Sequence, residues 1–474
     1  MTTVESFQDE KFIKAPSKLP PDNQDNRAPK LAVVLAISLG FIMAILDVTV
    51  VNVALGDIQH EFGSALPTLV WIIDAYTLTF ASLLMLGGSL ADWLGAKQAY
   101  ALGLLIFVFA SALCGGATST NMLIIARLLQ GCSAAFFVPS SLTLLTESFP
   151  DRATRTKMVG VWGAFIGAAA GAGPFIGGLL VHQFGWRSIF YLNLPIGALG
   201  VLLTAILLRP SQRSRRPFDL VSHLLIVGTL SGLSYTLIEG PSLGWFASRS
   251  IVLSTFTLVS TGALFLLRER TARHPVIPIE LLHNRPFWAL NGVGSLISFV
   301  LFGEIFVVSL FLEKDRGASA FWTGVEMLPI MGVFAFMNYF SGHLAARWGG
   351  RRIMTIGFSI GAFGAVTAAL LGSSVPYWEF VLAVAACNAG FALATPAMVA
   401  SVLYEAGEVY ANVGSAMLNA NRQVGALCGV AVMGLVIDLV PAWALSFRIA
   451  FATFAVCLLA ALILVRMGAR HTSD

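Results

Sequence analysis

Three charged side chains interrupt long apolar stretches of this 474-residue chain. Asp47, Asp74 and Arg127 each lie in a run long enough to cross a lipid bilayer. A charge at mid-bilayer costs at least about 2.5–3.5 kcal/mol, so each needs a charged partner or a water-filled cavity. Counted along their helices, all three lie about 10 Å below the same membrane surface. Two carboxylates sharing one guanidinium can leave one able to take up a proton. The sequence therefore predicts a buried, proton-binding triad.

A structural role is the alternative, because a buried charge can simply hold helices together. For Asp47 and Asp74 the shared depth favours a functional role, and for Arg127 both interpretations stay open. The second half of the chain has polar residues in comparable runs, without the same spacing. We interpret Glu304, Glu326, Asn419 and Arg422 as candidates for lining a substrate cavity.

The composition explains why such residues would lie in a membrane. Hydrophobic residues make up 57% of the chain and charged residues only 11%, whereas about 25% of a soluble domain is charged. A helix needs about 20 apolar residues to cross a bilayer. The sequence predicts an all-α integral membrane protein with fourteen transmembrane helices, near residues 31–54, 67–91, 98–119, 121–146, 157–182, 187–208, 219–239, 250–267, 287–312, 322–345, 353–372, 377–403, 411–437 and 443–466.

The loop charges predict the orientation of these helices. With the N-terminus inside, 22 lysines and arginines fall on the cytoplasmic side and 5 on the outer side. An excess of positive charge is typical of cytoplasmic loops. We therefore expect a multi-pass protein of the cytoplasmic membrane with both termini in the cytoplasm.

Two similar loops indicate an internal duplication. Residues 88–97 read GSLADWLGAK and residues 342–351 read GHLAARWGGR, and each loop joins the second and third helices of a six-helix block. Two such repeats with a substrate site between them are a recurrent transporter architecture, although basic turns can also look alike by chance. We predict a disordered cytoplasmic tail at 1–30, a six-helix bundle at 31–208, cytoplasmic linkers with two inserted helices at 209–286, a second, parallel six-helix bundle at 287–466 and a cytoplasmic tail at 467–474.

Small residues dominate the predicted helix at 157–182. Gly167, Gly171, Gly173, Pro174 and Gly177 would let a neighbouring backbone approach closely, and the Gly-Pro pair permits a kink. Such a helix can bend or slide, although close packing alone is the simpler explanation.

Several chemistries have no signature in this chain. It contains no GxxxxGK[ST] or HExxH motif, and its five cysteines have no metal-ligand spacing. We therefore expect no enzyme activity, no cofactor, no bound metal and no nucleic-acid partner. The energy for any transport would then come from an ion or solute gradient.

The loop at 88–97, Arg127 with Gln130-Gly131 and the glycine-rich helix together resemble the major facilitator superfamily. Residues 46–54 (LDVTVVNVA), residues 71–76 (WIIDAY) and the inserted helix pair resemble its fourteen-helix drug:proton antiporter branch. The stretches 191–197 (YLNLPIG) and 419–423 (NANRQ) look closest to methylenomycin A resistance proteins.

This resemblance implies roles for particular residues. Asp47 would be the proton-coupling acid, Asp74 a second acid facing the cavity, and Arg127 would modulate their affinity for protons. Gly173-Pro174 would match the motif of exporters. The residues of the inner gating loop would be Gly88, Asp92, Gly95 and Lys97.

The chain departs from the family pattern at three places. Trp93 replaces the usual arginine of the loop, Ala96 replaces a basic residue, and Gly56 stands where a proline is expected. The first two changes would weaken the charge network of the loop, and none removes a proposed proton carrier.

We therefore predict that the protein is a proton-coupled antiporter that exports small drug-like or antibiotic molecules by alternating access and acts as a monomer. Uptake or metabolite transport by the same fold is the first alternative. A membrane sensor without transport activity is the second, and the lack of any soluble stretch for a signalling domain counts against it.

Overall fold

The computed structural model describes residues 29–211, 213, 219–245, 247–271, 279–372, 375–440 and 442–468. These residues form helices and no strands, and fourteen helical stretches are long and apolar enough to cross a membrane. The predicted all-α fold with fourteen spanning helices is therefore confirmed. The predicted tails lie outside the described residues up to residue 28 and from residue 469.

The helices alternate along the chain with short connections, and several begin at a capping side chain. Asp151, for example, accepts a hydrogen bond of 2.8 Å from the Thr154 amide, which satisfies one of the free N–H groups of the first turn. The helices are α1 (Lys30–Val53), α2 (Leu55–Phe62), α3 (Leu66–Leu94), α4 (Ala96–Gly115), α5 (Thr120–Ser148), α6 (Arg152–Phe184), α7 (Ser188–Tyr191), α8 (Asn193–Leu207), α9 (Leu220–Leu243), α10 (Arg249–Thr271), α11 (Ile279–His283), α12 (Arg285–Lys314), α13 (Ala320–Trp348), α14 (Gly350–Leu371), α15 (Tyr377–Leu439) and α16 (Trp443–Gly468).

The pattern of one helix per crossing is broken at two places along the chain. Helix α15 contains two spans, Tyr377–Gly407 and Val413–Leu439, and Gly407 separates them with a φ of 69°. The sixth span, Ser188–Leu207, combines α7 and α8.

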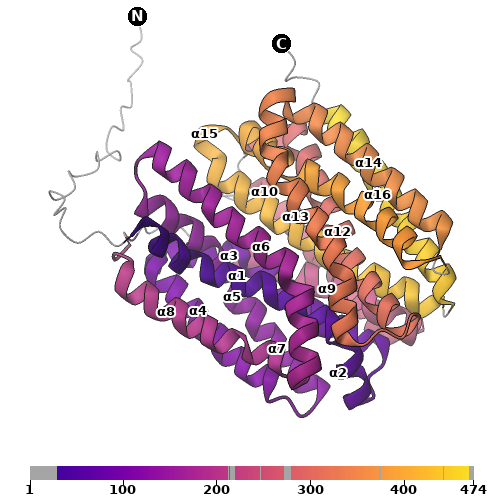
Figure 1. The fold of residues 1–474 in the computed structure, drawn as a ribbon. Coiled ribbons are helices and arrows are strands. Elements are labelled where there is room, and N and C mark those ends of the chain that lie inside the picture. The colour runs from indigo at the N-terminus through magenta and orange to yellow at the C-terminus, as the bar shows by residue number, and fades with distance from the viewer. Residues whose placement is uncertain are drawn as a thin grey trace, which may run out of the picture.

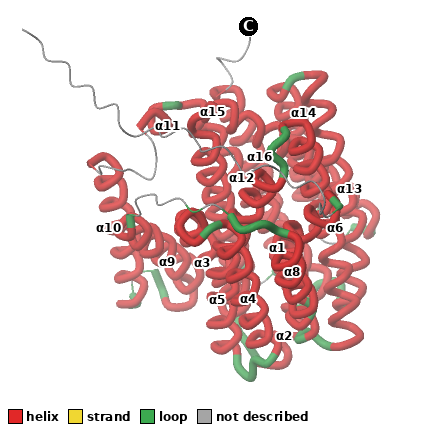
Figure 2. The backbone as a smooth tube through the Cα atoms, turned by 90° about the vertical axis from the view of Figure 1, so that its left-hand side faces the viewer, coloured by secondary structure: helices red, strands yellow, loops and turns green. Residues whose placement is uncertain are grey.

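The helices gather into two bundles, which Figure 1 shows in indigo to magenta and in orange to yellow. The first contains α1, α3, α4, α5, α6 and α8, and the second contains α12 to α16. Helices α9 and α10 pack against each other along one flank (Figure 2), and α9 also contacts α3 and α15, one helix from each bundle.

The two similar loops have the same backbone conformation. Gly95 follows α3 with φ 94° and ψ 138°, and Gly349 follows α13 with φ 85° and ψ 141°. A positive φ is unfavourable for residues with a Cβ. The shared conformation therefore explains why glycine occupies the same place in both loops.

Helices α6 and α13 bring the two bundles together at one end of the molecule, which we call the α2 end because it carries α2. The opposite end, where α1 begins and α16 finishes, we call the terminal end. At the α2 end the Ser309 hydroxyl of α12 donates a hydrogen bond of 2.9 Å to the Asn52 carbonyl of α1. Lys314 and Gln59 hydrogen-bond each other beside it. The rings of His182 on α6 and Phe321 on α13 lie 5.5 Å apart.

Helix α6 shows how the bundles separate toward the terminal end. A Cβ at Gly178 would collide with the Ala320 carbonyl of α13, and one at Gly171 would lie 3.5 Å from the Ala335 Cβ. Gly163 and Gly167 lie on the same face of α6, because residues three, four, seven and eight apart share a helix face. A Cβ at either would meet nothing within 4 Å. Helices α6 and α13 are therefore in contact at the α2 end and apart at the terminal end.

Candidate functional site

Asp47 is the centre of a buried polar network in the first bundle. It lies on α1, and only 3% of its surface is exposed. Its Oδ2 pairs with the Arg127 guanidinium of α5. Its Oδ1 accepts hydrogen bonds from Gln130 Nε2 at 3.2 Å and Asn193 Nδ2 at 3.0 Å. Two helices, α5 and α8, thus supply three side-chain donors to one carboxylate, and the charge of Arg127 balances its charge.

Further contacts hold these partners in place. Gln130 accepts a hydrogen bond of 2.9 Å from Arg127 and donates one of 2.8 Å to the Ser111 hydroxyl of α4. Arg127 Nε donates to the Ile72 carbonyl of α3 at 2.9 Å, and the guanidinium lies 4.6 Å from the Tyr76 ring centroid. These contacts fix the orientation of the Arg127 guanidinium.

Asp74 does not belong to this network, so the predicted triad is wrong. Arg127 contacts α3 through Ile72 and Tyr76, which share one helix face. Asp74 is two residues from each of them, and at 100° per residue it points about 200° away. Counting along a helix gives depth only and leaves the direction around the helix open.

The surroundings of Asp74 are apolar. It is fully buried, and neither carboxylate oxygen has a hydrogen-bond partner among the described residues. It lies close enough to Cys428 of α15 for their charges to interact. Its neighbours along α3, Trp71 and Leu78, pack with residues of α9 and α15. Asp74 therefore points toward the junction of α3, α9 and α15.

The four candidates of the second bundle do not form one site. Glu304 is 1% exposed and hydrogen-bonds Asn388 inside the bundle, so it does not line an open cavity as predicted. Its burial follows from the packing of α12 against α15 and α16, which surrounds the middle of α12. Glu326 is half-buried and has Arg316 as a neighbouring charge, and Asn419 is exposed. Arg422 donates a hydrogen bond of 3.3 Å to the Ser298 hydroxyl of α12.

The predicted inner gating loop lies at the terminal end. Lys97 Nζ donates hydrogen bonds to the carbonyls of Ala205, at 3.1 Å, and Leu208, at 2.6 Å, at the end of α8. A cation at a helix C-terminus satisfies its free carbonyl groups. A Cβ on Gly88 would meet no atom within 4 Å. The side chain of Asp92 lies outside the described part of the chain.

The glycines of α6 connect the Asp47 helix to the other bundle. A Cβ on Gly173 would overlap Thr49 of α1, and one on Gly177 would lie 2.8 Å from a Val50 methyl group. Pro174 lies within α6, and its carbonyl is against Gly324 of α13. Of the five predicted motif residues, Gly167 alone makes no such close approach.

Sequence reasoning missed the roles of Gln130, Asn193, Ser111 and Asn388. In the sequence, Gln130 and Asn193 stand out only as parts of family motifs, and Ser111 and Asn388 do not stand out. A signal existed, because buried polar groups need hydrogen-bond partners and all four lie in apolar runs. Their pairing required the three-dimensional arrangement.

The inserted helices contribute to a separate, partly open apolar pocket of about 230 Å³. Residues from α3, α9, α10, α12 and α15 line it, among them Ala81, Leu230, Phe265, Trp288 and Val424. In addition, Trp71 of α3 donates a hydrogen bond of 2.9 Å to Glu239 of α9. The inserted pair is thus joined to the first bundle by a specific contact.

Comparisons with known proteins agree with this architecture. Residues 37–430 match the family model described as Major Facilitator Superfamily. The chain is 43% identical over 425 residues to a methylenomycin A resistance protein of Bacillus subtilis (strain 168), covering 89% of this chain and 90% of that protein. It is 41% identical over 419 residues to a methylenomycin A resistance protein of Streptomyces coelicolor, covering 88% of each.

A solved structure has the same fold. It is a bacterial homologue of the human lysosomal transporter Spinster, described as inward-facing and unoccupied. The TM-score is 0.65 at 18% sequence identity, and the match covers 93% of this chain and 97% of that one.

Proposed function

Since the chain belongs to the major facilitator superfamily, we propose that it is a proton-coupled antiporter that exports small drug-like or antibiotic molecules across the cytoplasmic membrane. The observation that carries this proposal is the buried Asp47–Arg127 pair. In the proposed cycle its carboxylate exchanges the ionic partner for a proton without leaving the bundle. A buried acid inside a membrane bundle is typical of proton pathways in transporters.

A path of direct contacts supports coupling between this pair and the gate at the α2 end. Thr49 and Val50 follow Asp47 on α1 and pack against Gly173 and Gly177 of α6. One residue further along α6, Gly178 packs against α13 of the second bundle. A proton on Asp47 removes its charge and loosens its hold on Arg127. The resulting shift of α1 reaches the contact between the bundles through rigid helix packing.

The orientation predicted from the loop charges assigns each end of the molecule to one side of the membrane. With both termini in the cytoplasm, the α2 end faces outward and is closed, and the terminal end is open to the cytoplasm. Drug would enter the space between α6 and α13 from the cytoplasm. The bundles would then rock so that the α2 end opens, the drug would leave on the outer side, and protons would bind in its place. Asp74, buried without a hydrogen-bond partner, is the second candidate proton carrier in the N-terminal bundle. No cofactor is required, because the proton gradient supplies the energy, and the proposed unit is a monomer.

Export is favoured over uptake by the similarity to proteins named for antibiotic resistance. A transporter protects its own cell by lowering the internal concentration of the toxic compound. Uptake would raise that concentration.

The proposal is tested by transport in everted membrane vesicles, with methylenomycin A and ethidium as separate probes. We expect protein-dependent accumulation that stops when a protonophore collapses the pH gradient and continues when the gradient is imposed without ATP. Accumulation that needs ATP and survives the protonophore would exclude proton coupling. Protein-dependent loss of probe from the vesicles would reverse the assigned direction.

A further inference from the structure

Glu304 of α12 has a different partner from Asp47. It is 1% exposed, and its Oε1 accepts a hydrogen bond from Asn388 Nδ2 of α15. The Cys387 thiol contacts the same carboxyl group. Two acceptor atoms of this pair, Glu304 Oε2 and Asn388 Oδ1, are buried without a partner among the described residues.

One proton accounts for both unpartnered atoms. A carboxylate buried without a cation costs several kcal/mol, and leaving a buried acceptor unpaired costs about 1–3 kcal/mol more. A proton on Oε2 removes the charge and turns that oxygen into a donor. A carboxylic acid and a primary amide can then form two hydrogen bonds, from Nδ2 to Oε1 and from Oε2 to Oδ1.

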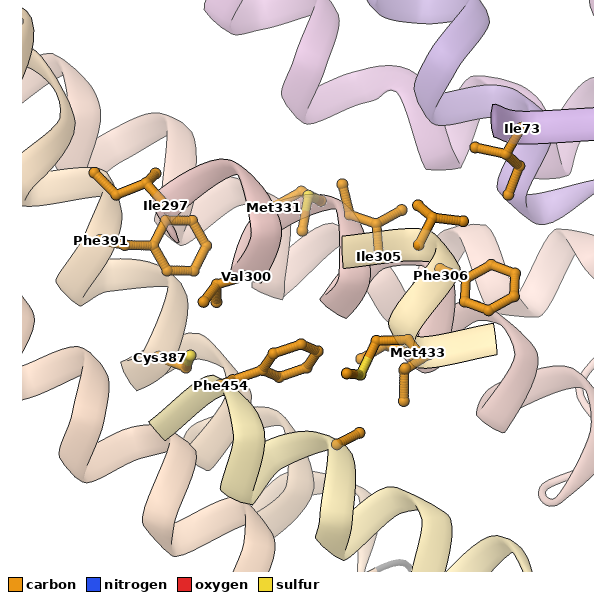
Figure 3. Packing of buried hydrophobic residues seen from close by; sticks show 14 of the residues in the cluster. Ile73, Ile297, Val300, Ile305, Phe306, Met331, Cys387, Phe391, Met433 and Phe454 are labelled. Atoms are coloured by element: carbon orange, nitrogen blue, oxygen red, sulfur yellow. The ribbon is translucent and has the colours of Figure 1, made fainter. Parts of the chain in front are cut away.

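No described side chain replaces that proton with a positive charge. The titratable group facing Glu304 is the Cys387 thiol, and no lysine, arginine or second acid of the helices packed against α12 contacts it in the described ranges. On α12 itself, Glu313 and Lys314 are nine and ten residues away, about 13–15 Å along the helix. Figure 3 shows the apolar residues of this region, including Val300, Cys387 and Phe454.

In the two-repeat architecture, this pair is the counterpart of the Asp47–Arg127 pair. Asp47 lies on the first helix of its bundle and binds Arg127 on the fourth helix. Glu304 lies on the first helix of the second bundle and binds Asn388 on the fourth. The corresponding helices thus hold an acid in both bundles, but an amide takes the place of the guanidinium. The first acid has a cationic partner and the second has a neutral one.

We propose that the Glu304–Asn388 pair is a second proton-binding site, so that the exporter carries a proton in its C-terminal bundle as well as in its N-terminal bundle. This inference rests on the proposed antiport. The proton enters from the α2 end. Ser309, five residues from Glu304 and about 7.5 Å along the helix, contacts Asn52 in the present closed gate. Opening the α2 end breaks that contact and brings water toward the pair, and closing it traps Glu304 with its proton bound.

Infrared spectroscopy tests proton binding without any drug. The C=O stretching band of a protonated carboxylic acid is recorded for the purified full-length protein in lipid nanodiscs, from mildly acidic to alkaline pH. We expect Glu304→Gln to remove one such band that is present at neutral pH in the wild type. Asn388→Leu should shift that band, and Asp438→Asn, which changes an exposed acid at the end of α15, should leave it in place. A Glu304→Gln spectrum identical to the wild type throughout would show Glu304 to be ionised and would overturn the inference.

The number of protons exchanged tests the role in transport. In proteoliposomes, the pH gradient that balances a fixed ethidium gradient gives the proton-to-drug ratio. We expect Glu304→Gln, which keeps the shape of the side chain, to lower this ratio by one, and Glu304→Asp to restore it. A wild type without proton coupling would overturn the proposed function and this role together. A coupled wild type with an unchanged ratio in Glu304→Gln would overturn the role of Glu304 alone.

Discussion

Asp47 and Asp74 are both buried acids of the first bundle, yet their surroundings are opposite. Asp47 receives hydrogen bonds or charge from three side chains, whereas Asp74 has no hydrogen-bond partner in the described structure. A group that alternates between charged and neutral states needs surroundings that tolerate both. Arg127 provides for the charged state of Asp47, and Gln130 and Asn193 can rotate their amides to suit the neutral one.

Replacing Asp47 tests the centre of this network. We expect Asp47→Asn to reach the membrane in normal amounts and to lower proton-driven ethidium transport by about a hundredfold, because an amide cannot release a proton. Western blotting and vesicle transport measure the two quantities, and Asp438→Asn is the matched control at an exposed position. Normal transport by Asp47→Asn would exclude Asp47 as the coupling acid.

Replacing Arg127 separates its charge from its geometry. The guanidinium bonds Asp47, Gln130 and the Ile72 carbonyl at once. A lysine is a point charge and cannot span all three. We expect Arg127→Lys to keep about a tenth of wild-type transport, and Arg127→Ala, which leaves Asp47 without a cation, to keep less than the Lys variant. Equal activity of the two variants would mean that the charge of residue 127 does not contribute to transport.

At the scale of elements, α6 connects α1, which carries Asp47, to α13 of the second bundle. Its glycines at 173 and 177 contact α1, and its glycines at 171 and 178 contact α13. Small residues allow helices to approach closely and to slide. This double contact gives the glycine pattern a role beyond packing.

Enlarging Gly173 tests that role. A leucine there would displace Thr49 and separate α6 from α1, so we expect transport by Gly173→Leu to fall by about tenfold or more at normal membrane levels. Ala168→Leu, on an exposed part of the same helix, should remain active. A fully active Gly173→Leu variant would mean that the glycines of α6 serve ordinary helix packing only.

The inserted helices are joined by an ion pair with a defined pH dependence. Arg268 of α10 donates hydrogen bonds of 3.0 and 2.9 Å to Asp219, the capping residue of α9. The Arg268 guanidinium holds the pKa of Asp219 well below its usual range. A lowered pKa means that the stabilisation is present above the unfolded pKa and is lost as the pH falls through the folded pKa.

Asp219→Asn isolates this ion pair, because asparagine keeps the helix cap. We expect the variant to melt at a lower temperature than the wild type at neutral pH. The difference should begin to shrink as the pH falls below the usual pKa of an aspartate, where the unfolded chain is protonated, and should disappear once the pH falls through the lowered pKa of the folded protein. Thermal unfolding in detergent measures it, and a difference independent of pH would assign the effect to something other than the ion pair.

At the scale of the whole molecule, α6 and α13 of the two bundles form a wedge closed at the α2 end. Alternating access requires a second state in which the terminal ends of α6 and α13 meet instead. Gly163 and Gly167, which now face no atom within 4 Å, provide the smooth surface for that contact.

Paired cysteines can detect the two states. We expect His182→Cys with Phe321→Cys, at the α2 end where the two rings lie 5.5 Å apart, to cross-link readily in the drug-free protein and to stop transport until the link is reduced. Gly163→Cys with Tyr339→Cys, toward the terminal end, should cross-link poorly without substrate. Mobility shifts on gels read out both pairs. Faster cross-linking of the terminal-end pair would mean that the drug-free protein prefers the opposite state.

Much of the architecture could be predicted from the order of residues, because a bilayer imposes a local rule. Each crossing needs about 20 apolar residues with their backbone groups bonded internally, so length and hydropathy define the spans. The same rule made Asp47 and Arg127 conspicuous. The two loop glycines, Gly95 and Gly349, were also recognisable, because their backbone conformation is a local property.

The tertiary structure alone decided which buried groups meet. Contact between two side chains depends on the direction each takes around its helix and on which helices are neighbours, and neither can be counted along the chain. Asp74 therefore faces away from Arg127 despite its matching depth, and Glu304 meets Asn388, 84 residues later. The wedge between the bundles is likewise a property of the packed molecule, since identical glycines of α6 are covered at one end and open at the other.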